Sequence, residues 1–118
     1  MSRRAYLAAV IQLYLEQPGA PPQASRQDWA VAQTLYALGV ALPDFAHAVY
    51  LATLRRTHRT GQPLPPVRGL AYYRRVFDQL SPEERDPGYV RYVADHYATL
   101  ISQHAPSDRQ NPAVSDRR

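Results

Sequence analysis

Apolar side chains recur along this chain every three or four residues, which is the spacing of one face of an α-helix. Residues 3–16 show the pattern with Leu7, Val10, Ile11 and Tyr14. Its clearest form follows Asp86 and Pro87, at Val90, Val93, Ala94, Tyr97, Leu100 and Ile101. No stretch alternates apolar and polar residues as a half-buried strand would. The pattern therefore predicts an all-α chain.

Capping and helix-breaking residues divide this pattern into about five helices. Prolines interrupt it shortly after residue 16. Ser25 with Asp28 gives a capping-box-like start for the second helix, and Gly39 is a terminator just past its end. Pro43 suits the first turn of the third helix. The predicted helices cover about residues 3–16, 26–38, 43–59, 67–80 and 87–105, with one short turn after residue 81.

The predicted fold is a compact bundle of about five helices in a single domain, residues 1–105. A chain of 118 residues suits one domain and can bury a core without disulfides. From Pro106 onward the sequence is polar and has no aromatic residue. Residues 106–118 are therefore expected to form a disordered tail.

The composition excludes several classes of protein and site. There is no cysteine, which rules out disulfides, thiolate zinc sites and cysteine nucleophiles and fits a cytoplasmic protein. No run approaches the roughly 18 consecutive apolar residues of a membrane span, so no membrane contact is expected. The basic N-terminus precedes an apolar run that Gln12 and Glu16 interrupt, without a small-residue cleavage signal. We therefore expect a core helix there rather than a signal peptide.

Positive charge is concentrated near the middle of the chain. All 14 basic side chains are arginine, and the net charge is +4. Between Thr53 and Leu80 the net charge is about +5, whereas the rest of the chain carries about −1. This window, the arginine patch, contains Arg55, Arg56, Arg59, Arg68, Arg74 and Arg75. Because a guanidinium fork suits phosphate, the arginine patch predicts contact with a nucleic-acid backbone.

Other interpretations of the arginine patch stay open. Basic residues at the end of the third helix complement its dipole, and those on the fourth helix can solvate its outer face. An acidic protein partner would also suit this charge. The start of the third helix, where a helix-turn-helix would read bases, offers only Asp44 and His47. Any DNA contact is therefore expected to involve phosphates, with weak sequence preference.

A longer run of residues carries a second signal. Trp29, Leu35, Gly39-Val40, Phe45 and Ala48-Val49 precede the basic loop, and Tyr72, Val76 and Leu80 follow it at four-residue intervals. Residues 29–80 thereby resemble the C-terminal domain of DnaD-like primosome and phage-replication proteins. That family pairs a helix after a glycine with a later helix bearing Tyr-x-x-x-Ile-x-x-x-Trp, and leucine stands here in place of the tryptophan. The resemblance implies an all-α domain that contacts DNA near this motif as a non-catalytic replication accessory.

Tyr72 is the one aromatic candidate for contact with nucleic acid. Tyr73 and Phe77 lie nearer the centre of the apolar arc of the fourth helix, which places Tyr72 at the edge of the arginine patch. An aromatic ring in that position can stack on a base. The alternative interpretation is that Tyr72, Val76 and Leu80 form a packed helix stripe.

The sequence contains no recognisable catalytic or metal-binding arrangement. The acids at 83–86 lie at predicted helix starts, where they favour the helix dipole. The glycines are isolated, so there is no phosphate-binding loop, and no pair of histidines has the i, i+4 spacing of a helical metal site among His47, His58, His96 and His104. We therefore expect no enzyme activity, metal or cofactor.

These observations predict a non-enzymatic DNA-binding accessory protein, with DNA favoured over RNA. The resemblance implies a role in a bacterial or phage replication or mobile-element system. The alternative is a helical protein-interaction module or a small subunit of a larger nucleoprotein complex. That alternative predicts little DNA binding by the isolated chain.

Overall fold

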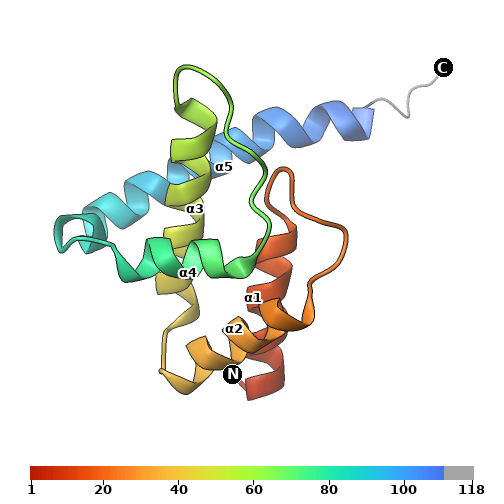
Figure 1. The fold of residues 1–118 in the computed structure, drawn as a ribbon. Coiled ribbons are helices and arrows are strands. Elements are labelled where there is room, and N and C mark those ends of the chain that lie inside the picture. The colour runs from red at the N-terminus through yellow and green to blue at the C-terminus, as the bar shows by residue number, and fades with distance from the viewer. Residues whose placement is uncertain (111–118) are drawn as a thin grey trace.

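The computed structural model describes residues 1–110, and the side chains of residues 1–103. This part of the chain contains helices and no strand, which confirms the predicted all-α fold (Figure 1). The elements are α1 (Arg3–Leu15), α2 (Arg26–Ala37), α3 (Leu42–His58), α4 (Leu70–Asp78), the 3-10 turn η1 (Glu83–Arg85) and α5 (Pro87–Gln110).

Helix α3 is the centre of the fold. It packs against α1, α4 and α5, while α1 also packs on α2 and α2 on α4. In Figure 1, α4 crosses in front of α3 and α5 passes behind it. One apolar cluster lies between α1, α2, α3 and α4, with Phe45 and Val49 fully buried. A smaller cluster between α3 and α5 contains Leu51, Leu80 and Val93.

Trp29, Ala32, Leu35 and Tyr36 recur along α2 at the spacing of one helix face, which predicts that all four are buried. The buried stripe is narrower in the structure. Ala32 and Leu35 are buried as expected. Trp29 and Tyr36, which share the helical spacing, remain 39% and 38% exposed. The pattern placed these large rings on the inner face, but they lie at its border, where the ring of Tyr36 packs on Tyr6.

Asp28 holds the beginnings of two helices. Its Oδ2 atom accepts a hydrogen bond from the Ser25 backbone N–H (2.8 Å), and the Ser25 hydroxyl accepts one from the Asp28 N–H (3.1 Å). This confirms the predicted capping box. Its other oxygen, Oδ1, accepts a hydrogen bond from the buried Leu70 N–H (2.9 Å) at the start of α4. A carboxylate suits both helix N-termini because their free N–H groups carry partial positive charge.

Helix α4 is shorter than predicted. The sequence indicated residues 67–80, whereas the helix covers Leu70–Asp78. Its start is fixed by the Asp28 carboxylate, with Gly69 extended as the N-cap residue. At its other end the Phe77 carbonyl accepts hydrogen bonds from the Leu80 backbone N–H (3.3 Å) and from the Arg85 guanidinium (2.9 Å), which together cap the last turn.

Helix α5 enters the segment that we expected to be a tail. It continues to Gln110, so residues 106–110 extend the helix. The remainder of the predicted tail, 111–118, lies outside the described residues. Within the described part of the chain, no helix combines the length and hydrophobicity needed to cross a bilayer.

A buried hydrogen-bond network links α1, α3 and α5 near the part of α3 that carries Arg55 and Arg56. The Gln17 side chain, 4% exposed, donates hydrogen bonds to the Leu13 carbonyl and the Tyr97 hydroxyl, both at 2.9 Å. Its Oε1 atom accepts a hydrogen bond from the Thr53 hydroxyl (2.7 Å). Since α1, α3 and α5 each contribute a partner, this network fixes the end of α3 that carries the first arginines.

Burial of tyrosine hydroxyls predicts a loss of stability at high pH. Desolvation raises the pKa of Tyr73 to about 12, with hydrogen bonding to Thr53 opposing the shift. Burial also raises the pKa values of Tyr6, Tyr14, Tyr50 and Tyr97 above 10.0. The folded state then holds protons that the unfolded chain loses. Its stability is complete below about pH 10 and falls as pH rises towards about 12.

Denaturant unfolding across that pH range measures this effect. Tyr73→Phe should flatten the decline, because it removes the tyrosine with the largest raised pKa. Tyr92→Phe is the control, since the Tyr92 side chain is 55% exposed. Equal slopes for both variants would contradict the assignment.

Candidate nucleic-acid interface

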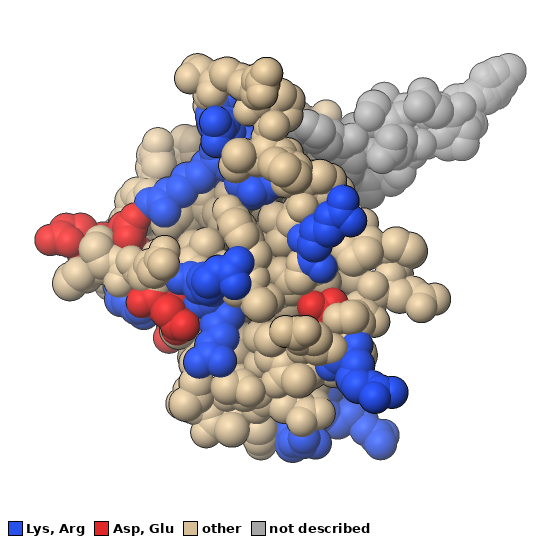
Figure 2. Space-filling model, in the orientation of Figure 1, with Lys and Arg blue, Asp and Glu red and all other residues tan. Residues whose placement is uncertain are grey.

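The six arginines of the arginine patch lie on the last turns of α3, on the loop after it and on α4. Figure 2 shows arginine side chains spread over the face that carries these elements, with acidic side chains along one edge. Arg55, Arg59, Arg68 and Arg75 are exposed, and Arg56 and Arg74 are half-buried. The structure thus brings the six residues to one region, but as separate groups with different partners.

Two of these arginines are paired with acids. The Arg74 Nε atom lies 3.5 Å from the Asp78 Oδ2 atom, one helical turn further along α4. Arg55 forms an ion pair with Glu84 of η1. The pKa of the Glu84 carboxyl is lowered by its hydrogen bond from the Ser81 backbone N–H and by Arg55. The charge count between Thr53 and Leu80 did not include Glu84, because this residue lies outside that window in the sequence. Only the packing of η1 near α3 brings Glu84 to Arg55.

Four arginines of the patch have no acidic partner within the described part of the chain, and three of them are exposed: Arg59, Arg68 and Arg75. Arg59 is the C-cap residue of α3, where the backbone turns extended, and Arg68 lies two residues before α4. Arg75 is on the exposed side of α4. These guanidinium groups can therefore bind an anion without first breaking an ion pair.

Arg56 is held in place by neutral groups. Its Nη2 atom donates a hydrogen bond to the Pro65 carbonyl in the loop. Its guanidinium carbon lies 5.3 Å from the centre of the Tyr72 ring, within the range of a cation–π contact. Tyr72 is half-buried, next to the fully packed Tyr73, so it does lie at the edge of the arginine patch. Because neither partner is acidic, no negative charge beside Arg56 offsets the positive charge of its guanidinium.

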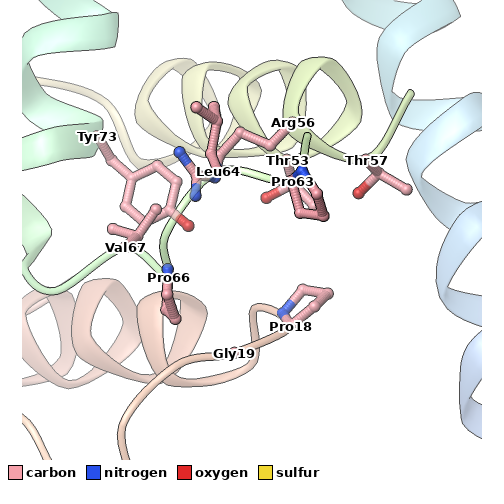
Figure 3. A pocket seen from close by; sticks show the side chains of 10 residues that line it. All are labelled: Pro18, Gly19, Thr53, Arg56, Thr57, Pro63, Leu64, Pro66, Val67 and Tyr73. Atoms are coloured by element: carbon pink, nitrogen blue, oxygen red, sulfur yellow. The ribbon is translucent and has the colours of Figure 1, made fainter. Parts of the chain in front are cut away.

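A pocket of about 310 Å³ opens beside Arg56. Its walls come from four segments: the turn after α1 with Pro18, the end of α3 with Arg56, the loop with Pro66 and Val67, and α4 with Tyr73. Figure 3 shows the Arg56 guanidinium and the Tyr73 hydroxyl on one side of it and Pro18 with Gly19 on the other. None of the lining residues is acidic. Sequence reasoning missed this pocket, and the proline-rich loop was its only signal.

The motif behind the family resemblance divides between core and surface. Leu80 is buried in the cluster between α3 and α5, and Val76 packs against both apolar clusters. Only Tyr72 contacts the arginine patch, through Arg56. For Val76 and Leu80 the packed-stripe interpretation holds, whereas Tyr72 is placed where a surface role is available.

The two polar residues at the start of α3 are not arranged for base readout. His47 is 4% exposed, and its Nε2 atom lies 2.7 Å from the Glu84 carbonyl. Asp44 is exposed in the first turn, where its charge favours the helix dipole. Among the described residues, no group of three histidine, aspartate or glutamate side chains gathers as a metal site.

Comparison of the chain with protein-family models, with curated proteins and with solved structures finds no match. The resemblance to DnaD-like domains therefore stays a prediction.

Proposed function

We propose that this protein binds DNA through its phosphate backbone and acts as a non-enzymatic accessory protein. In this proposal Arg59, Arg68 and Arg75 contact phosphates directly. One observation carries it: Arg56 is fixed by the Pro65 carbonyl and the Tyr72 ring, while arginines on the adjoining segments have no acidic partner. Such an arrangement offers positive charge that is already positioned and unneutralised, which is what a phosphate backbone requires.

The arginines of the patch contribute unequally in this proposal. A phosphate that approaches Arg55 or Arg74 must compete with Glu84 or Asp78. Arg56 has already lost side-chain freedom to its contacts with the loop and Tyr72, so it binds at a lower entropic cost. The binding surface therefore consists mainly of Arg56, Arg59, Arg68 and Arg75, with smaller contributions from Arg55 and Arg74.

The resemblance to DnaD-like domains supports DNA as the partner and an accessory role in replication or in a mobile element. The direct test is an electrophoretic mobility assay of the isolated chain at low salt, with single-stranded DNA, double-stranded DNA and RNA of one sequence. We expect retardation of DNA that is lost when salt is raised, because counterion release drives phosphate binding. No retardation of any nucleic acid at low salt would reject the proposal.

Two neighbouring arginines on α4 provide a matched comparison. Arg75→Gln should weaken DNA binding by about tenfold at low salt, because a free charge-assisted contact is worth about 1.5 kcal/mol. Arg74→Gln should weaken it by less than about threefold, since Arg74 is engaged with Asp78. Fluorescence anisotropy with one labelled oligonucleotide measures both. A larger loss of affinity for Arg74→Gln than for Arg75→Gln would contradict the proposal that Arg75 is the stronger phosphate contact.

A protein-interaction module is the second candidate function, and exposed apolar side chains on and just after α2 favour it. Trp29, Tyr36 and Leu38 are 39%, 38% and 62% exposed. Trp and Tyr are enriched at protein interfaces. This function predicts that Trp29→Ala abolishes binding to a protein partner and leaves DNA binding unchanged. The mobility assay separates the two candidates, because only the first requires DNA binding by the isolated chain.

A further inference from the structure

The pocket beside Arg56 differs from the rest of the arginine patch because it is a hollow in the surface, of about 310 Å³. Phosphate contacts need only exposed charge, and Arg59 and Arg75 supply that without a cavity. The pocket adds flat apolar walls from proline rings, including Pro18 and Pro66. Since the proline ring fixes φ, these walls are rigid before any ligand arrives, which lowers the entropic cost of binding.

Its polar groups favour a ligand rich in hydrogen-bond acceptors. Arg56 uses one N–H of Nη2 for the Pro65 carbonyl. Its second Nη2 N–H, together with the neighbouring Nε or Nη1 atom, leaves a two-donor fork that makes no hydrogen bond within the described part of the chain. The Thr53 hydroxyl is already committed to Gln17. The exposed Thr57 hydroxyl lies on the rim. A ligand therefore meets the Arg56 guanidinium and the Tyr73 hydroxyl beside apolar walls.

The pocket also adjoins, along the chain, two arginines that have no acidic partner among the described residues. Two of its lining residues, Thr57 and Val67, are close in sequence to the unpaired Arg59 and Arg68. A strand whose phosphates contact those arginines would pass the mouth of the pocket. The group that such a strand can insert into a hollow of this size beside proline rings is an unstacked base.

We infer that this pocket holds one unpaired guanine of a single-stranded nucleic acid, an inference that rests on the proposed function. Guanine presents two acceptors, O6 and N7, on one edge, and arginine is their commonest partner because its fork matches both. Adenine and cytosine each place a donor on the corresponding edge, which would face the arginine unfavourably. The apolar walls cover the faces of the base, and Arg56 contacts its edge. The pocket thus adds a preference for one base to a surface that otherwise binds phosphates.

The test compares short oligothymidines that differ only at one central position, by fluorescence anisotropy at fixed salt. The oligonucleotide with central guanine should bind about tenfold more tightly than those with thymine, adenine or cytosine, as expected for a bidentate arginine contact. Thr57→Phe should fill the mouth and remove this preference while oligothymidine still binds. The matched control is Thr60→Phe, an exposed loop position outside the pocket, which should keep the preference.

Arg56→Lys provides a second variant, in a residue type that favours the helix as much as arginine does. It retains the positive charge but loses the fork, so the guanine preference should disappear. Equal affinity of the wild-type chain for all four oligonucleotides would overturn the inference and leave the proposed function intact. A preference that survives in both Thr57→Phe and Arg56→Lys would also overturn it. If no oligonucleotide binds at low salt, the proposed function and the inference both fail.

Discussion

Replacing Asp28 with alanine should lower the free energy of unfolding by about 3 kcal/mol, the sum of a lost helix cap and an orphaned buried donor. The carboxylate accepts hydrogen bonds from the Ser25 and Leu70 backbone N–H groups. The side chain is 3% exposed, so water cannot readily replace it. Because the Leu70 bond joins α2 to the start of α4, its loss should also loosen the segment that carries Arg68.

Chemical denaturation followed by circular dichroism measures this effect. Asp28→Asn should cost less than alanine, because one amide oxygen still accepts a hydrogen bond. The matched control is Asp44→Ala, an exposed acid in the first turn of α3 that makes no side-chain cap. We expect it to change stability by less than about 1 kcal/mol. Similar losses for the Asp28 and Asp44 alanine variants would show that Asp28 does not hold two helices.

Replacing Arg59 and Arg68 together with glutamine should weaken DNA binding by about a hundredfold at low salt, at about 1.5 kcal/mol for each charged contact. Both residues are exposed and lack an acidic partner in the described part of the chain. Removing them takes away charge that no acid currently offsets. The fold should tolerate the change, because neither side chain belongs to the apolar clusters.

Arg3→Gln with Arg4→Gln is the charge-matched control. It also removes two exposed arginines, from the first turn of α1, which lies away from the end of α3 (Figure 1). If net charge alone governed binding, both double variants would lose the same affinity. We expect the α1 variant to lose less than about threefold, because only general attraction is reduced.

Much of the fold was predictable because local signals agreed with one another. The Ser25–Asp28 capping box, Pro43 and the stripe on α5 placed helices close to where they occur. The start of α4 was wrong by three residues because it depends on Asp28, which lies 42 positions away in the sequence. Trp29 is more exposed than its helical spacing predicts, because this spacing shows which face of α2 is apolar but not how much of that face other helices cover.

The candidate site was predictable as a set of residues but not as an arrangement. Six arginines in one window and Tyr72 at its edge could be read from the sequence. The ion pair between Arg55 and Glu84 could not, since η1 reaches α3 only through tertiary packing. The pocket was equally hidden, because four separated segments form its walls. Local sequence patterns show which residues share a helix face. The formation of ion pairs and pockets depends instead on how the helices pack against one another.

The most direct test of the central claim is the salt dependence of DNA binding by the intact chain and by the Arg59→Gln/Arg68→Gln variant. A plot of the logarithm of the binding constant against the logarithm of salt concentration should fall linearly for the intact chain. The slope of the double variant should be shallower by about 1.5, as each lost phosphate contact removes about 0.7–0.9. Parallel slopes for the two proteins, or no measurable binding by the intact chain at low salt, would contradict the claim that Arg59 and Arg68 contact DNA phosphates.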